Sequence, residues 1–219
     1  THFHAQPLKN WLNDPNGPMY INGKYHLFFQ YNPESAKWGD MHWYHMVSTD
    51  MLHWKHLPVA LAPDQSYDCG GIFSGSATVF HNESTGQDVP VLTYSVACGK
   101  AVVNAFPADP TDPDLTNWTK PSYNPVIQVP ASVAGGFRDP TTAWQGKDRA
   151  WRMLVGCGAG EGTCEFKSRD FVNWTYTGPF HKARGTEMWE CPDFYRLPGT
   201  DAYVLKASDG GDWWTVGQF

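Results

Sequence analysis

Three acidic residues in this sequence, Asp14, Asp139 and Glu190, stand in short motifs that each contain a proline close behind the acid. Carboxyl groups that meet in a partly buried pocket raise one another's pKa, so one can hold a proton while another stays ionised. That combination can protonate a departing oxygen and attack a carbon or activate water, which is the chemistry that splits a glycosidic bond. The plainer interpretation is that each Asp-Pro pair only shapes a turn.

The elements that must position these acids repeat along the chain. An Asp that precedes a Trp by four residues recurs at intervals of about 60 residues, as expected for a repeat architecture, in the segments STDMLHWKHLP, DPDLTNWTKP and SRDFVNWTYTG. These segments contain Asp50 and Trp54, Asp114 and Trp118, and Asp170 and Trp174. The spacing suggests that one structural unit is built several times.

Each repeated unit also contains a hairpin pattern. Four segments consist of a polar opener, an apolar run, a turn and a second apolar run, and they begin with NDPNGP, FSGSAT, FRDPTT and WECPDF. The turns INGK, QGKD and LPGT carry the Gly, Asn or Asp of β-hairpins. Convincing helical periodicity is absent. Units of this length with several strands predict the blades of a β-propeller rather than a β-sandwich.

The propeller prediction places the three acids together. Asp14, Asp139 and Glu190 stand at or just before the first strand of units one, three and four. Because the innermost strands of a propeller begin near its axis, equivalent positions converge at one mouth of the central channel. The sequence holds three complete units and the start of a fourth, whereas closed propellers have about four to eight blades. We therefore expect the chain to end within a blade of an unfinished ring.

Composition excludes several classes of function. The net charge is −6 and there is no basic run, which argues against nucleic-acid binding. No stretch approaches the roughly 18 apolar residues of a membrane-spanning helix. Aromatic residues make up 15% of the chain, with 11 Trp, which suits stacking on sugars, although ring packing between sheets must account for most of them. The nine His residues show no metal-ligand spacing.

Sequons and cysteines indicate the cellular route. Asn82, Asn117 and Asn173 each begin an N-x-[ST] sequon in a polar or turn-like stretch. We predict N-glycosylation there and a secreted, extracellular or cell-wall location, with the vacuole less favoured. The five cysteines leave pairing open: Cys157 could pair with Cys164 and Cys69 with Cys98, or all could be free buried thiols. Cys191, beside Glu190, would be a neighbour of the site or a small buried filler.

The motifs around the three acids resemble the signatures of a known family. WLNDPNGP at 11–18, FRDP at 137–140 and WECPDF at 189–194 are similar in order and spacing to those of glycoside hydrolase family 32, as are FFQYNP and FSGSAT between them. This family contains invertases, inulinases, levanases and plant fructan enzymes. The resemblance implies a five-bladed, all-β propeller, of which residues 1–219 form an N-terminal catalytic portion of about three to four blades. The remaining blades and a C-terminal β-sandwich would lie outside this sequence, and a second chain could supply the blades.

The same resemblance implies roles for individual residues. Asp14 would be the nucleophile of a retaining β-fructofuranosidase, Glu190 the general acid and then base, and Asp139 a hydrogen-bond partner of the fructose hydroxyls. Retention implies that the Asp14 and Glu190 carboxyls lie about 5–5.5 Å apart. The matching substrate-binding positions are Trp11, Asn13, Gln30, Trp38, Phe73, Ser74 and Arg138. The expected partner is a small carbohydrate, and no metal or other cofactor is required.

Sequence details bear on the substrate and the reaction. Trp11 favours hydrolysis, because its replacement accompanies fructosyl transfer in similar plant enzymes. Pro192 in WECPD resembles cell-wall invertases and fructan exohydrolases rather than vacuolar invertases. Phe73 departs from the Trp that plant members carry in WSGSAT, and the stretch after Lys206 is shorter than in plant invertases. Sucrose and β-linked fructans are therefore both candidate substrates.

Three other functions are alternatives to this one. A fructosyltransferase that uses sucrose as donor would share every catalytic residue. A related five-bladed enzyme acting on arabinofuranosides or xylosides would use three carboxylates but invert the anomeric carbon. A non-catalytic sugar-binding propeller would be expected to have lost a carboxylate, and all three acids are present.

Overall fold

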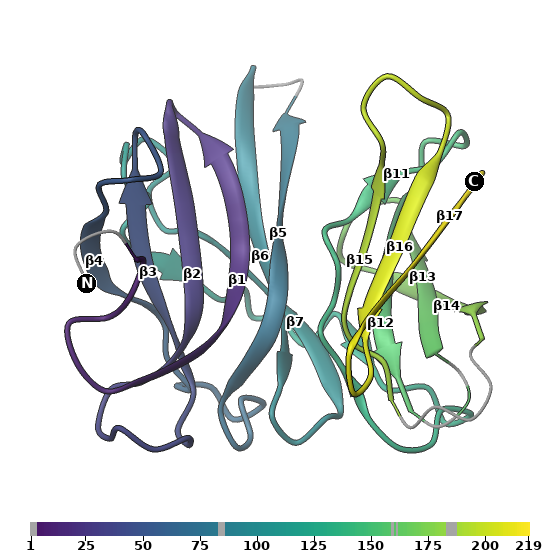
Figure 1. The fold of residues 1–219 in the computed structure, drawn as a ribbon, viewed down its shortest axis with the longest axis horizontal. Helices are drawn as coiled ribbons and strands as arrows, with labels where there is room; N and C mark the ends of the chain where they lie inside the picture. Colours follow the sequence, from purple (N-terminus) through teal and green to yellow (C-terminus); the bar gives the residue numbers. More distant parts are fainter. Residues whose placement is uncertain (1–3, 83–85, 159, 161, 183–187) are drawn as a thin grey trace.

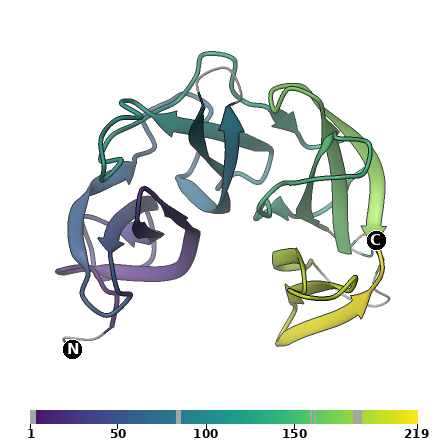
Figure 2. The same cartoon turned by 90° about the horizontal axis from the view of Figure 1, so that it is seen from above.

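The computed structural model describes residues 4–82, 86–158, 160, 162–182 and 188–219 as four antiparallel β-sheets, with no helix among these residues. The sheets follow one another around an arc, as Figure 2 shows from above. Each sheet is built mainly from strands consecutive in the sequence, which is the arrangement of propeller blades. The predicted all-β propeller is confirmed. No helix in the described part of the chain is long and apolar enough to span a membrane.

Blades I and II form the N-terminal half of the arc (Figure 1). Blade I has the strand order β1 (Trp11–Ile21), β2 (Lys24–Asn32), β3 (His42–Ser48) and β4 (Lys55–Leu61). Blade II is built from β5 (Ile72–Asn82), β6 (Gln87–Val96), β7 (Ala101–Pro107), β8 (Trp118–Thr119) and β9 (Ile127–Gln128), with β9 pairing with β7. The INGK turn closes the first hairpin, where Ile21 pairs with Lys24 and the two central residues have φ of 52° and 75°.

Blades III and IV complete the arc. Blade III contains β10 (Phe137–Arg138), β11 (Trp144–Gln145), β12 (Trp151–Cys157), β13 (Gly162–Ser168) and β14 (Trp174–His181), with β10 and β11 both paired to β12. Blade IV contains β15 (Glu190–Arg196), β16 (Tyr203–Ser208) and β17 (Asp212–Gly217). The first strands of the blades are therefore β1, β5, β10 and β15, and each carries or adjoins residues of the predicted pocket.

Large apolar side chains fill the spaces between blades. Phe28 and Trp43 of blade I pack in one cluster with Leu92 and Tyr94 of blade II, and all four are completely buried. A second cluster joins blades II and III, and a third joins blade III to blade IV through Leu154, Trp189 and Leu205. Burying such side chains stabilises the fold by about 1.5–3 kcal/mol each. Much of the aromatic content therefore serves packing.

The repeated Asp-x-x-x-Trp segments form the turns that enter the outer strands. Asp50 and Asp170 each accept hydrogen bonds from the backbone N–H groups two and three residues later, at 2.7–2.9 Å. The residue after each Asp has positive φ, 61° at Met51 and 63° at Phe171. Asp114 of the second segment differs, because its carboxylate pairs with Lys24 and Lys55 of blade I.

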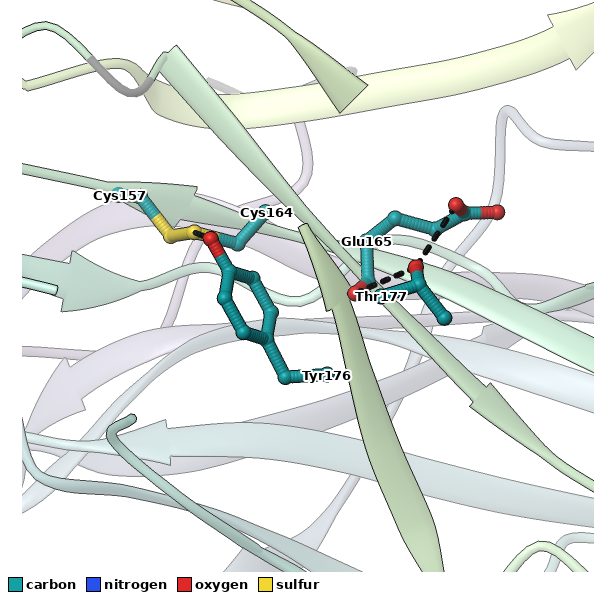
Figure 3. The surroundings of a disulfide bond; sticks show 5 residues. All are labelled: Cys157, Cys164, Glu165, Tyr176 and Thr177. Atoms are coloured by element: carbon teal, nitrogen blue, oxygen red, sulfur yellow. Dashed lines mark hydrogen bonds between the residues drawn. A yellow bond between two sulfur atoms is a disulfide. The ribbon is translucent and has the colours of Figure 1, made fainter. Parts of the chain in front are cut away.

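Both cysteine pairs that the sequence left open are disulfides. Cys69 bonds to Cys98 in the loops flanking β5 and β6, and Cys157 bonds to Cys164 across β12 and β13. Figure 3 shows the second bond with Tyr176, whose hydroxyl lies 3.8 Å from Cys164 Sγ. Among the described cysteines, Cys191 is the free one. Cys191 lines the cavity described next.

Candidate active site

One cavity of about 560 Å³ lies where the first strands of the blades meet. It brings together all of the sequence-predicted pocket residues except Trp11, namely Asn13, Asp14, Gln30, Trp38, Phe73, Ser74, Arg138, Asp139 and Glu190. Cys191 and Ser208 complete its lining. Residues from all four blades therefore face one space, although Asp14 and Glu190 stand near opposite ends of the chain.

Asp14 lies at the end of a chain of hydrogen bonds between side chains. The Ser74 hydroxyl donates to Asp14 Oδ2 at 2.6 Å, and the Gln30 amide donates to Ser74 Oγ at 2.6 Å. Asn13 Nδ2 donates to Gln30 Oε1 at 3.0 Å. Trp11 Nε1 donates to Asn13 Oδ1 at 2.8 Å, so Trp11 joins the site through Asn13 rather than by lining the cavity.

The donor and acceptor in each of these hydrogen bonds can be assigned starting from Trp11. An indole N–H can only donate, so the Asn13 oxygen faces Trp11 and its NH₂ group faces Gln30. The same reasoning makes Gln30 a donor to Ser74. Ser74 is left with its proton directed at Asp14. Every bond thus points toward the carboxylate, and hydrogen bonds to a charged acceptor are the stronger kind.

Asp139 is the most enclosed of the three acids, with 6% of the residue exposed. Burial raises the pKa of its carboxyl group to about 6, while the backbone N–H of Cys191 and the charge of Arg138 oppose the rise. Asp14 and Glu190 raise this pKa further by charge repulsion. The main cause is therefore burial, with the repulsion predicted from the sequence acting as a smaller contribution.

Backbone conformation also marks the Asp139 region. Asp139 has φ of 65° and Cys191 has φ of 45°, and non-glycine residues rarely adopt this left-handed region. The Cys191 N–H donates to Asp139 Oδ2 at 2.9 Å, and Cys191 Sγ lies 3.7 Å from the same oxygen. Strained backbone of this kind gathers at functional sites, where the surroundings hold it in place.

Glu190 stands at the open side of the cavity. Its side chain is 51% exposed and forms an ion pair with Arg138 Nη2. Arg138 Nε also lies 3.9 Å from Asp139 Oδ2, so one guanidinium group lies between two of the acids. Arg138 can therefore orient both carboxyl groups, which stand on different blades.

An aromatic pair, Trp38 and Phe73, also lines the cavity. Trp38 and Phe73 meet edge to face with ring centroids 6.1 Å apart. Trp38 is 57% exposed, so one face of its indole is free to contact a ligand. Aromatic faces provide apolar contact beside polar groups, and this cavity has both on its wall.

Several residues near the site were missed or left undecided by sequence reasoning. Ser208, at the end of β16, lines the cavity but stands in no recognisable motif. Asn16 is 1% exposed and accepts a hydrogen bond from the Gly75 N–H at 3.1 Å, which joins β1 to β5. Cys191 contacts Asp139 directly rather than filling space alone. Asn16 and Cys191 carried a sequence signal, their places inside NDPNG and WECPDF, whereas Ser208 carried none.

The remaining predictions concern glycans and metals. Asn117 and Asn173 are exposed, whereas Asn82 ends β5 and the rest of its sequon lies outside the described residues. Asn173 Nδ2 donates to Asp170 Oδ2 at 2.8 Å. Within the described ranges, no group of three or more His, Cys, Asp or Glu could hold a metal ion.

Comparison with known proteins agrees with the fold and the motifs. Residues 4–215 match the family model described as the glycosyl hydrolases family 32 N-terminal domain. The chain is 43% identical over 96% of its length to the rose "Acid beta-fructofuranosidase 2, vacuolar", and 48% identical over 95% to the rice "Beta-fructofuranosidase, insoluble isoenzyme 6". It spans 33% and 36% of those proteins, about a third of each. The chain belongs to glycosyl hydrolase family 32.

Solved structures show the same similarity in three dimensions. The fold superimposes on fructan 1-exohydrolase IIa of chicory, solved in complex with 1-kestose, with a TM-score of 0.90 at 39% identity. All of this chain and 44% of that chain are covered. A silkworm β-fructofuranosidase of the same family gives a TM-score of 0.80 at 32% identity over 99% of this chain and 48% of the other.

Proposed function

We propose that residues 1–219 are the N-terminal, catalytic propeller portion of a retaining β-fructofuranosidase that hydrolyses terminal β-D-fructofuranosides. The observation that carries this proposal is the single cavity into which Asp14, Asp139 and Glu190 all face. Family membership and relatives named as β-fructofuranosidases support the reaction class. The remaining blades and a C-terminal β-sandwich would complete the enzyme, from the same chain or from a second one.

In the first step, Asp14 would attack the anomeric carbon of the fructosyl unit. The hydrogen-bond chain ending at Ser74 holds the Asp14 carboxylate in one orientation, which suits a nucleophile. Glu190 would protonate the leaving oxygen as the bond between that oxygen and the anomeric carbon breaks. Its exposed position at the open side of the cavity suits contact with the rest of the sugar.

In the second step, Glu190 would remove a proton from water as the water oxygen attacks the anomeric carbon and breaks that carbon's bond to Asp14. Asp14 would then be regenerated and fructose released with its original anomeric configuration. Double displacement of this kind requires the two carboxyls to lie about 5–5.5 Å apart, and inversion requires about 6.5–9.5 Å. Arg138, paired with Glu190, would keep that carboxyl group at the correct distance.

Asp139 would bind fructose hydroxyl groups rather than react. A buried carboxyl group with raised pKa exchanges hydrogen bonds with sugar hydroxyls in a site of low dielectric, where such bonds are strong. Bonds that strengthen as positive charge develops on the ring would lower the barrier. Trp38 and Phe73 would contact the apolar side of the sugar.

The test is turnover by the natural full-length protein on sucrose, 1-kestose and inulin. Hydrolysis predicts free glucose and free fructose in equal amounts from sucrose, whereas a fructosyltransferase would accumulate a trisaccharide at high sucrose. Release of arabinose or xylose, but no fructose, from the corresponding furanosides or xylosides would contradict the proposal. Binding of sucrose without any turnover would instead indicate a sugar-binding propeller.

The three sequons and the two disulfides support a route through the secretory pathway. Relatives named as vacuolar and as insoluble both match the chain. We propose N-glycosylation at Asn82, Asn117 and Asn173 and a cell-wall or extracellular destination. Mass spectrometry of the natural protein before and after deglycosylation tests the glycans, and cell fractionation tests the location.

A further inference from the structure

Ser95 is a completely buried serine on β6 that stands behind the cavity wall. Its hydroxyl group donates to the backbone carbonyl of Ser74 at 2.9 Å. The same oxygen accepts a hydrogen bond from the backbone N–H of Asp139 at 3.0 Å. One side chain of blade II therefore joins the residue that contacts Asp14 to the acid of blade III.

The two residues that Ser95 joins are both tightly placed. Ser74 must direct its hydroxyl to Asp14 Oδ2 while it accepts from Gln30. Asp139 must hold a left-handed backbone, which persists only where the surroundings determine it. The Ser95 hydrogen bond fixes the N–H of that strained residue.

Other hydrogen bonds continue along the boundary between blades II and III. The Ser76 hydroxyl donates to the Pro140 carbonyl at 2.8 Å. Thr78 Oγ1 accepts from the Ala143 N–H at 2.9 Å. These bonds attach one blade to the next, whereas the Ser95 bonds also end on residues that line the cavity.

We propose that Ser95 is a positioning residue, which sets the orientation of Asp139 relative to Asp14 through the Ser74 backbone. This inference rests on the proposed function, because its effect is read from turnover. When the Ser95 hydroxyl is removed, the Asp139 N–H and the Ser74 carbonyl lose their partner in a buried place. Both residues then shift to find new partners, and displacements of about 1 Å can lower turnover by about 10²-fold.

The test compares two single substitutions in the natural full-length protein. Ser95→Ala and Thr78→Val each remove a buried hydroxyl of blade II that accepts a hydrogen bond from a backbone N–H of blade III. We expect similar losses of melting temperature from both. Ser95→Ala should lower kcat on sucrose by about 10- to 100-fold with KM changed less, in line with a misplaced catalytic geometry. Thr78→Val should keep kcat within about twofold.

A third variant separates positioning from a merely structural role. Ser95→Thr keeps the hydroxyl group and should restore most of the kcat that Ser95→Ala loses. Equal kcat for Ser95→Ala and Thr78→Val in an enzyme whose wild type releases fructose would overturn the Ser95 inference alone. A wild-type protein that releases no fructose would overturn the proposed function and this inference with it.

Discussion

Aspartates at the outer turns and the aspartate Asp139 at the axis occupy opposite electrostatic environments. At the outer turns, Asp50 and Asp170 accept backbone N–H bonds, which hold the pKa of each carboxyl well below its usual range. At the axis, burial raises the pKa of Asp139 to about 6. The same residue type thus has its ionised form stabilised at the outer turns and its neutral form favoured at the axis.

The difference shows how a repeat fold separates stability from chemistry. The outer Asp-x-x-x-Trp turn has the same local role wherever its Asp accepts these bonds. The carboxylate accepts hydrogen bonds from backbone N–H groups that precede an outer strand. The axial positions are equivalent in the repeat but carry different residues, and they are free to hold a cluster that costs stability. Substitutions in the two regions should therefore have separable effects.

The largest effect is expected from the axial acids. Asp14→Asn and Glu190→Gln should each lower kcat on sucrose by at least about 10²- to 10⁴-fold, because each removes a group proposed to bond to or exchange protons with the substrate. Steady-state kinetics and substrate binding measured separately should show turnover lost and binding kept. Near-normal kcat in either variant would refute the roles assigned to these two residues.

Acid pH should act on a buried pair of histidines, His26 and His45, which are 1% and 0% exposed and 3.0 Å apart between Nδ1 and Nε2. Burial lowers their pKa values to about 4 and about 3. Below pH 6.5, which is the ordinary pKa of His, these two side chains bind protons in the unfolded chain but stay neutral in the folded protein. Their contribution to the free energy of unfolding is complete above pH 6.5. It falls by about 1.4 kcal/mol per pH unit for each His as the pH drops toward 4.

Thermal unfolding between pH 7 and pH 4.5 checks the histidine prediction. The double variant His26→Leu/His45→Phe should show a shallower loss of melting temperature with acid than the wild type. His81→Asn, at an exposed His paired with Asp88, should keep the wild-type slope. An unchanged slope in the double variant would show that other groups govern acid stability. Asp139 acts in the opposite sense, since its raised pKa favours the folded state more as the pH falls from 6.

A smaller effect is expected from the hydrogen-bond chain behind Asp14. Ser74→Ala should lower kcat by about 10- to 100-fold, which corresponds to the roughly 1.5–3 kcal/mol of a hydrogen bond to a charged group. Ser76→Ala, two residues further along β5, is the matched control and should retain wild-type kcat. Comparable losses in the two variants would indicate a general weakening of β5 rather than a specific action on Asp14.

The smallest effect should come from the outer turns. Asp170→Ala removes the acceptor for the N–H groups of Val172 and Asn173, and should cost roughly 1 kcal/mol, as loss of a capping side chain does. The melting temperature should fall while kcat stays at its wild-type value. Asp201→Ala, at an exposed Asp paired with Arg196, should leave both unchanged. A kcat defect in Asp170→Ala would contradict the separation of the two regions.

The sequence could predict the fold because its repeats are local. Hairpin turns such as Asn22-Gly23 and the period of the Asp-x-x-x-Trp segments depend on neighbouring residues alone. The period predicts that the first strands of the blades lie near the axis. It therefore also predicts that Asp14, Asp139 and Glu190 lie close together. The disulfides could not be decided in this way, because pairing depends on Cα separations, 5.6 Å and 5.9 Å here, that only the packed loops define.

Contacts between blades were beyond sequence reasoning. Ser95 stands in an apolar strand, and nothing in TYSV indicates that its hydroxyl faces two backbone groups of the site. Ser208 reaches the cavity only because β16 pairs with β15 in a register that places Ser208 opposite Glu190. Such roles depend on register and on packing between sheets, neither of which leaves a pattern within one strand.

The central claim is that acids from separate blades act on one sugar at the axis, with Asp14 as the nucleophile. The most direct measurement uses Glu190→Gln with β-fructofuranosyl fluoride, whose fluoride leaves without help from an acid. A protein lacking the base for the second step should accumulate a covalent fructosyl group, and mass spectrometry of its peptides should find that group on Asp14. A fructosyl group on a different residue, or release of the inverted anomer with no adduct, would contradict the account.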